Sequence, residues 1–329
     1  MINSPFFKQA DLLVQVIPFV NTEACFALKG GTAINFFVRN FPRLSVDIDL
    51  VYLPVEDRPT TLRGIDAALQ RIAVKIRRAM PTAQVREQKL ATDNLLVKLT
   101  VRAPSGAEVK IEPNTILRGT LYPTTERNLT SRAVEVFGRS ATMRVVSLAE
   151  LYGGKLCAAL DRQHPRDFFD VHGLFQAEGI TDDIRLSFVI FLASHDRPMS
   201  ELLNPNRKEL KQVFADQFEG MTLDPVPLTV LENAREQLIE RINTDLTTAE
   251  REFLLSMKRL EPKWELLGMP GVERLPRSQW KLYNLRRRDP AKRLAPKNCF
   301  NRNLDYDALL AGRPASLLPG RSCDEKVAR

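Results

Sequence analysis

Apolar and polar residues alternate along the first half of the chain in short runs that are typical of strands. Two of these runs, at 94–103 and 107–114, are joined through Pro-Ser-Gly, which predicts a hairpin. Apolar residues at helical spacing predict helices over 32–41 and about 60–80. The other predicted strands are residues 24–28, 45–53 and 142–146.

From residue 147 onward the pattern is almost entirely helical. A capping-box pattern begins a predicted helix over 147–161, and Pro165 begins a second one. We therefore expect an α+β fold, in which a mixed sheet is followed by a mostly helical part. The expected domains are residues 1–146, residues 147–284, and a basic tail rich in Pro and Arg at 285–329.

Composition narrows the class of protein. A chain of 329 residues with 44% hydrophobic content is long enough for two globular domains. It has neither an apolar run of about 18 residues nor the basic-then-apolar pattern of a secretory signal at its N-terminus. The four cysteines are scattered without a C-x-x-C pair, which argues against a zinc site or a disulfide framework. We expect a cytoplasmic protein with no membrane partner.

Charge suggests a polyanionic partner. The net charge is +8. The segment from Arg277 to Arg302 contains nine Lys or Arg residues and only one acidic residue. Trp280, Tyr283 and Phe300 are interleaved with these cations. Basic and aromatic side chains together can hold phosphates and stack on bases, so RNA is one candidate partner. A solvated basic extension is the other interpretation.

Two aspartates stand inside a predicted strand. In SVDIDL, residues 45–50, the apolar residues occupy one face, so Asp47 and Asp49 share the other. Their carboxylates would repel each other, and a divalent cation would relieve that repulsion. The alternative is an edge strand with solvated acids.

A glycine pair precedes these aspartates. Gly30 and Gly31 lie between a predicted strand and a predicted helix, where glycine permits a tight turn and close approach to a ligand. The free N–H groups at the start of that helix favour phosphate, and Thr32 adds a hydroxyl. A third acid, Glu108 or Glu112, follows on the polar face of the strand at 107–114. Spacing alone does not choose between the two.

Charged residues also fall on apolar helical stripes. Lys155 aligns with Leu148 and Leu151, so we expect its side chain to point inward toward a charged partner or a ligand. Asp167 lies on the inward face of the next helix, where it could pair with Lys155 or act as a general base. Asp170 is the second choice for this acid, because its spacing from Arg166 predicts a surface ion pair.

The order of these motifs resembles that of the AbiEii/AbiGii-type toxin nucleotidyltransferases, which include the MenT-like toxins of bacterial toxin–antitoxin systems. The motifs are Gly-Gly-Thr at 30–32, RLSVDIDL at 43–50, KIE at 110–112, ELYGGKLCAAL at 150–160 and RDFFDV at 166–171. The resemblance continues through the helical stretch EREFLLSMKRLEPKWELL, and so covers most of the chain. It implies a DNA polymerase β-like nucleotidyltransferase domain, followed by a helical domain that completes the active site.

The resemblance assigns nucleotide-binding roles to five residues near the first motifs. Gly30, Gly31 and Thr32 match the turn that holds the nucleoside triphosphate. Thr32 stands where the wider superfamily typically has serine. Arg43 and Ser45 match polar residues that approach the phosphates.

The resemblance assigns the metal and the chemistry to five others. Asp47 and Asp49 match the D-x-D metal ligands, and Glu112 takes the third-carboxylate position, where many relatives have Asp. Lys155 matches the lysine that contacts the phosphates, and Asp167 the acid of the last motif. A site with two Mg²⁺ ions is implied.

The resemblance also implies a function. The expected protein is a toxin that transfers a nucleoside monophosphate (NMP) from an NTP to RNA, at the 3′ end of tRNA, and so blocks aminoacylation and growth. A cognate antitoxin is implied as a partner. The alternatives are an enzyme that modifies a protein or a small hydroxylated acceptor, and a non-catalytic regulator that binds nucleotides.

Overall fold

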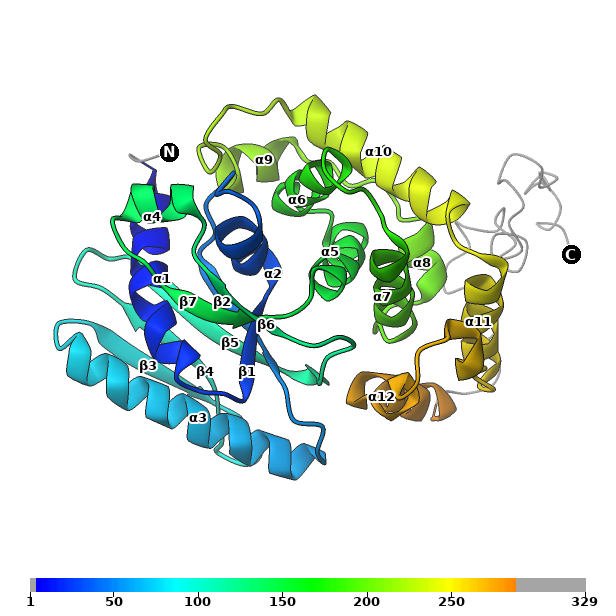
Figure 1. The fold of residues 1–329 in the computed structure, drawn as a ribbon, viewed down its shortest axis with the longest axis horizontal. Coiled ribbons are helices and arrows are strands. Elements are labelled where there is room, and N and C mark those ends of the chain that lie inside the picture. Colours follow the sequence, from blue (N-terminus) through cyan, green and yellow to red (C-terminus); the bar gives the residue numbers. More distant parts are fainter. Residues whose placement is uncertain (1–3, 288–329) are drawn as a thin grey trace, which may run out of the picture.

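A seven-stranded mixed sheet forms the centre of the computed structural model, which describes residues 4–287 (Figure 1). The strand order is β3-β4-β5-β2-β1-β7-β6. β1 pairs in parallel with β7, and β2 in parallel with β5, whereas all other neighbours are antiparallel. The strands are β1 (Phe26–Lys29), β2 (Asp47–Tyr52), β3 (Gln84–Lys89), β4 (Leu96–Arg102), β5 (Glu108–Arg118), β6 (Thr125–Asn128) and β7 (Thr142–Val145).

Alternation along the central strands decides which face of the sheet is buried. Ile48, Leu50 and Ile111 are fully buried on one face. The helices α1 (Pro5–Asn21) and α3 (Arg58–Ala79) pack against each other and cover that face (Figure 1). Asp47 and Asp49 alternate with the buried residues, so they lie on the opposite face.

The second half of the chain is helical and lies beside the sheet (Figure 1). Helix α5 packs against both α6 and α7, and α10 packs against α6. No helix of the described residues is long and apolar enough to cross a membrane. The helices are α4 (Ser131–Phe137), α5 (Leu148–Arg162), α6 (Pro165–Phe175), α7 (Asp182–Ala193), α8 (Met199–Leu203), α9 (Lys211–Gln217), α10 (Leu228–Thr244), α11 (Thr248–Arg259) and α12 (Pro276–Arg286), with 3₁₀ turns η2 (Trp264–Leu267) and η3 (Val272–Arg274).

Most of the predicted elements are confirmed. The hairpin β4–β5 and the helix α3 form where the pattern placed them. The predicted helix at 32–41 is instead one α-helical turn, α2 (Gly30–Thr32), followed by a π-helix, η1 (Ala33–Val38). Residues 33–37 are all buried, so packing rather than helix propensity sets this geometry.

The predicted capping box at residues 147–150 forms only in part. Ser147 Oγ accepts a hydrogen bond from the Glu150 N–H, but the Glu150 carboxylate accepts from the Tyr122 N–H instead of returning to Ser147. The predicted domain boundary falls in the short link between β7 and α5, and the division into domains stays a prediction. Of the predicted tail, residues 288–329 lie outside the described part of the chain.

Candidate active site

The parallel pairing of β2 with β5 brings the predicted carboxylates to one face of the sheet. Asp47 is the register partner of Lys110, and Asp49 is the register partner of Glu112. Burial and the neighbouring Asp49 raise the pKa of Asp47, and Glu112 acts in the same direction. Register places Glu108 elsewhere, opposite Arg102 of β4. The structure therefore brings Glu112, rather than Glu108, closer to the two aspartates.

The charge of this face fits a divalent cation, although the ligand set is not assembled. Within residues 4–287, no three or more His, Cys, Asp or Glu side chains are grouped closely enough to hold a metal ion. Glu112 forms an ion pair with Lys98 of the neighbouring strand. Two carboxylates that repel each other in a partly buried place suit Mg²⁺, which prefers hard oxygen ligands. The metal set of Asp47, Asp49 and Glu112 stays a prediction.

The glycine turn lies directly against the strand that carries the aspartates. Gly30 has φ +74°, and a Cβ added there would lie 2.6 Å from Asp49 Oδ2. A Cβ on Gly31 would lie 2.8 Å from Arg43 Nη2 and 3.2 Å from Ser45 Oγ. A side chain at either position would have to displace a residue of the site, and the positive φ of Gly30 disfavours any other residue there.

Buried hydroxyls fasten this turn to the strand. Thr32 Oγ1 donates to the Asp47 carbonyl at 2.6 Å and lies 2.9 Å from Ser45 Oγ. Thr32 is 1% exposed and Ser45 is 7% exposed. The hydroxyls thus fix the position of Asp47 relative to the glycines, and their predicted contacts with phosphate stay predictions.

Arg43 lies beside the glycine turn and links it to the helical half of the chain. Its Nε and Nη2 donate to the two carboxylate oxygens of Asp170, at 2.8 and 2.6 Å. Its Nη1 donates to the Leu44 carbonyl at 2.8 Å. A two-pronged contact of this kind is the strongest geometry available to an Arg–carboxylate pair. In this arrangement Arg43 joins α6 to the loop before β2, and its contact with phosphate stays a prediction.

Lys155 points inward, as its place on the apolar stripe predicted. Its Nζ donates to Asp167 Oδ1 at 2.8 Å and lies 2.9 Å from Asp170 Oδ2. Burial alone would raise the pKa of Asp167, but Lys155 and Arg162 hold it below its usual range. Asp170 has a lowered pKa for a similar reason, because Arg43 and Lys155 outweigh the effect of its burial. The pairing of Lys155 with Asp167 is confirmed.

The predicted surface ion pair between Arg166 and Asp170 is wrong. Asp170 is 3% exposed and binds Arg43 and Lys155 instead. The i and i+4 spacing suggested a surface pair, but Asp170 also lies one turn after Asp167 on the buried face of α6. Its partner Arg43 lies 127 residues earlier, beyond the reach of any local pattern.

Two further arginines contribute positive charge to the site, and neither was predicted from the sequence as a site residue. Arg162, at the end of α5, donates from Nη2 to Asp167 Oδ1 at 2.7 Å, and its exposed guanidinium also interacts with Asp49 through space. Arg166 is only half-buried and lies within electrostatic reach of Asp47. No hydrogen bond or ion pair holds its guanidinium among the described residues. RDFFDV contains Arg166 beside Asp167, which was the available signal.

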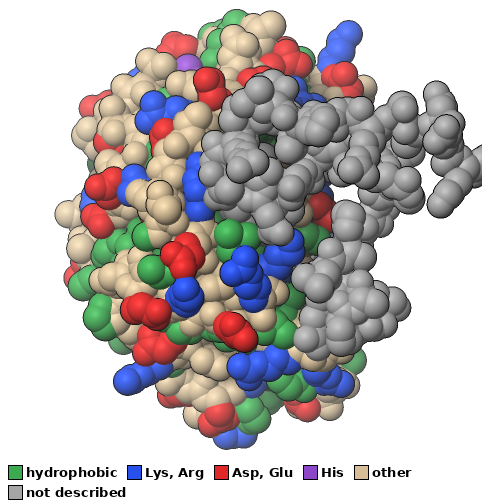
Figure 2. Space-filling model, turned by 90° about the vertical axis from the view of Figure 1, so that its right-hand side faces the viewer, with side chains coloured by type: hydrophobic (Ala, Val, Ile, Leu, Met, Phe, Trp, Pro, Cys, Tyr) green, Lys and Arg blue, Asp and Glu red, His purple; other side chains and the backbone are tan. Residues whose placement is uncertain are grey.

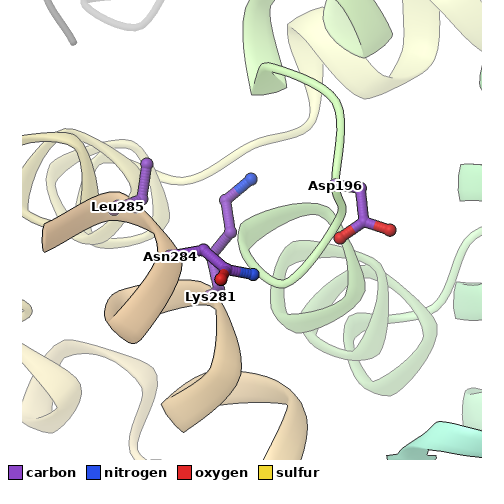
Figure 3. Close-up of a pocket in the computed structure, with 4 residues that line it drawn as sticks. All are labelled: Asp196, Lys281, Asn284 and Leu285. Carbon is purple, nitrogen blue, oxygen red and sulfur yellow. The ribbon is translucent and has the colours of Figure 1, made fainter. Parts of the chain in front are cut away.

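Part of the basic run near the C-terminus is structural. Arg277 is 2% exposed, donates from Nη2 to the Gly119 carbonyl at 3.0 Å and lies 3.7 Å from Glu150 Oε1. Lys281 extends from α12 toward the loop that holds Asp196, where its Nζ donates to the His195 carbonyl (Figure 3). Basic and acidic side chains are intermingled on the side of the molecule that carries α11 (Figure 2). These two cations are buried within the fold and are therefore not available to RNA.

Comparison with known proteins places the chain. A family model described as "Nucleotidyl transferase AbiEii toxin, Type IV TA system" matches residues 11–282. The solved structure of MenT4, a nucleotidyltransferase toxin from Mycobacterium tuberculosis, matches with a TM-score of 0.58 at 17% identity, over 80% of this chain and 92% of that one. The search of curated proteins finds no match. The chain therefore belongs to the AbiEii family and is a nucleotidyltransferase toxin of a type IV toxin–antitoxin system.

Proposed function

We propose that this toxin transfers an NMP from an NTP to RNA, at the 3′ end of tRNA, in a Mg²⁺-dependent reaction. The NTP is the substrate that a nucleotidyltransferase requires, and a toxin of this kind has a cognate antitoxin. The observation that carries the proposal is the close approach of Gly30 to Asp49, because a glycine turn before a helix is the kind of structure that binds phosphate, and here it adjoins a carboxylate.

Asp47 and Asp49 would hold the metal, with Glu112 joining them if it leaves Lys98. When bound, Mg²⁺ would supply Lewis-acid polarisation of the α-phosphate and offset the charge of the departing pyrophosphate. The repulsion that raises the pKa of Asp47 would be relieved in that state.

The cluster beside these acids has a surplus of positive charge. Four cations surround two buried carboxylates, Asp167 and Asp170. The cations are Arg43, Lys155, Arg162 and Arg166. A triphosphate would be attracted to that surplus, and preorganised cations stabilise charge on a transferring phosphoryl group. Arg162 and Arg166, whose guanidinium groups are the more accessible, are the residues we propose to contact the phosphates.

Lys155 and Asp167 would act together in this scheme. Asp167 is fully buried, and its lowered pKa keeps it ionised, which makes it a poor general base. It would instead hold Lys155 and Arg162 in place as a positioning residue. The ammonium of Lys155 would then neutralise charge near the phosphates through its location between α5 and α6.

The proposal is tested by the identity of the labelled acceptor. Purified protein is incubated with Mg²⁺, total bacterial tRNA and each α-labelled NTP in turn, beside tRNA whose 3′-terminal diol has been oxidised with periodate. We expect label on intact tRNA with one NTP, and none on the oxidised tRNA. Label on protein or on a small molecule instead would reject RNA as the acceptor. Binding of NTP without turnover would favour the non-catalytic alternative.

A further inference from the structure

The face of the sheet that carries the two aspartates continues across three more strands. Asp47 is opposite Lys110 of β5, Lys110 is opposite Thr100 of β4, and Thr100 is opposite Arg86 of β3. We call Lys110, Thr100 and Arg86 the sheet row. Two strand spacings of about 4.8 Å make the row about 10 Å long, and a third spacing separates Lys110 from Asp47. It leads from the edge strand β3 to the candidate active site.

This face is open to solvent, in contrast to the face beneath it. Leu99, Val101 and Val109 alternate with residues of this face and are buried on the side covered by α1 and α3 (Figure 1). Lys110 and Arg86 are exposed. Such alternation is typical of a sheet with one buried and one solvated face. The side chains of the sheet row can therefore meet a large partner.

A hollow lies at the outer end of the sheet row. It has a volume of about 530 Å³, and Arg86 and Arg102 are among the residues that line it. These two arginines come from neighbouring antiparallel strands, and Arg102 is opposite Gln84, two residues before Arg86. Two arginines that line one hollow supply the kind of donors that bind a phosphate group.

Away from the two aspartates, this face carries a small surplus of positive charge. Four cations stand on it, namely Arg86, Lys98, Arg102 and Lys110. Away from the aspartates, the acids on this face are Glu108 and Glu112, and Glu112 is paired with Lys98. The sheet row contains no aromatic side chain on which a base could stack. Phosphates, rather than bases, are therefore the groups that this surface would contact.

We propose that the sheet row, with Arg102, binds the sugar–phosphate backbone of the acceptor RNA and leads its end to Asp47 and Asp49. This inference rests on the proposed function, because it supplies the binding surface for the RNA acceptor. Contacts to phosphate alone make the binding independent of base sequence and sensitive to salt.

The test measures RNA affinity without NTP. Fluorescence anisotropy with labelled bacterial tRNA gives the dissociation constant between 50 and 200 mM KCl for the wild type and for the double variant Arg86→Gln/Arg102→Gln. We expect about tenfold weaker binding, and a salt slope smaller by about 1.4, since each contact to a single strand contributes about 0.7. The charge-retaining pair Arg86→Lys/Arg102→Lys should recover most of the affinity.

A matched control removes two arginines from α3, the helix that covers the other face of the sheet. Arg63 and Arg78 are exposed on α3, so Arg63→Gln/Arg78→Gln changes the net charge equally, and we expect near wild-type affinity. Equal affinity of the two Gln pairs would overturn the sheet row as the RNA surface. If the wild type still labels tRNA in that case, the proposed function stands. If the wild type neither binds nor labels tRNA, both are overturned.

Discussion

Gly30 and Asp49 are in direct contact at the centre of the site. A Cβ at Gly30 would come within 2.6 Å of Asp49 Oδ2, and the antiparallel pairing of β1 with β2 places Lys29 opposite Asp49. The turn after β1 therefore passes over the carboxylate that the family resemblance assigns to the metal. The amides proposed to bind phosphate and the oxygens proposed to bind metal share one place because β1 ends and β2 begins there.

Gly30→Ala should reduce NMP transfer on the order of 100-fold, because the methyl group would displace Asp49 from its position. Gly138→Ala is the matched control. Gly138 also has a positive φ, of +62°, but an added Cβ meets nothing within 4 Å. Steady-state rates of label transfer check this, and equal losses in the two variants would show that backbone strain alone is responsible.

Lys155→Met should lower the free energy of unfolding by about 3–5 kcal/mol, because it leaves Asp167 and Asp170 buried with one cation fewer. Urea denaturation measures the change. Lys263→Met removes a cation from an exposed ion pair with Glu252 and should leave the midpoint almost unchanged. Similar midpoints for both variants would contradict the buried network.

Asp47→Asn should raise stability while it abolishes NMP transfer. The pKa of Asp47 is raised in the fold, so its ionised form is destabilised at neutral pH and a neutral amide relieves that cost. A gain of about 1 kcal/mol is expected. Thermal unfolding at pH 7 and at pH 4 tests the cause, because the gain should shrink at the lower pH, where Asp47 itself takes up a proton. If Asp47→Asn were less stable than the wild type at pH 7, the ionised Asp47 carboxylate would not be a source of instability.

Asp167 should contribute stability at neutral pH and lose that contribution in acid. Its pKa is lowered in the fold, so the unfolded chain binds more protons, and the contribution is full above the ordinary pKa of 3.8 and falls as the pH drops below it. The destabilisation caused by Asp167→Asn, measured by urea denaturation, should therefore be large at pH 7 and smaller at pH 3.5. A difference that grows on acidification would reverse the assigned sign.

Glu112→Gln should abolish most NMP transfer, whereas Glu108→Gln should retain it. Glu112 is the register partner of Asp49, and Glu108 lies opposite Arg102. Rates measured over a range of Mg²⁺ concentrations separate loss of metal binding from loss of chemistry. Comparable loss in both variants would remove Glu112 from its predicted place as the third carboxylate.

The sequence predicted those parts of the fold that have one buried face. The alternation around Asp47 and Asp49, and the stripe that carries Lys155, follow directly from burial on one side. The edge strands β3 and β6 were missed because almost all of their residues are exposed, so they show no apolar alternation. Pairing with β4 and β7 makes them strands.

Individual residues of the candidate site were predicted, but the ion pairs that join them across the fold were not. Motif order suggested Asp47, Asp49 and Lys155. The contact of Arg43 with Asp170 joins positions 127 residues apart, which only the folded chain brings together. In the basic run, Arg277 was expected on the surface, and its burial beside Glu150 is a consequence of how α12 docks.

If Asp49 holds the metal, transfer of an NMP to RNA depends on its carboxylate. The direct measurement is the rate at which label passes from an α-labelled NTP to tRNA in the presence of Mg²⁺, for the wild type, for Asp49→Asn, and for Glu108→Gln as a folded control that also lacks one acid. We predict labelling by the wild type and by Glu108→Gln, and none by Asp49→Asn when its thermal unfolding shows it to be folded. Labelling by Asp49→Asn at the wild-type rate would show that the Asp49 carboxylate is not needed for the transfer.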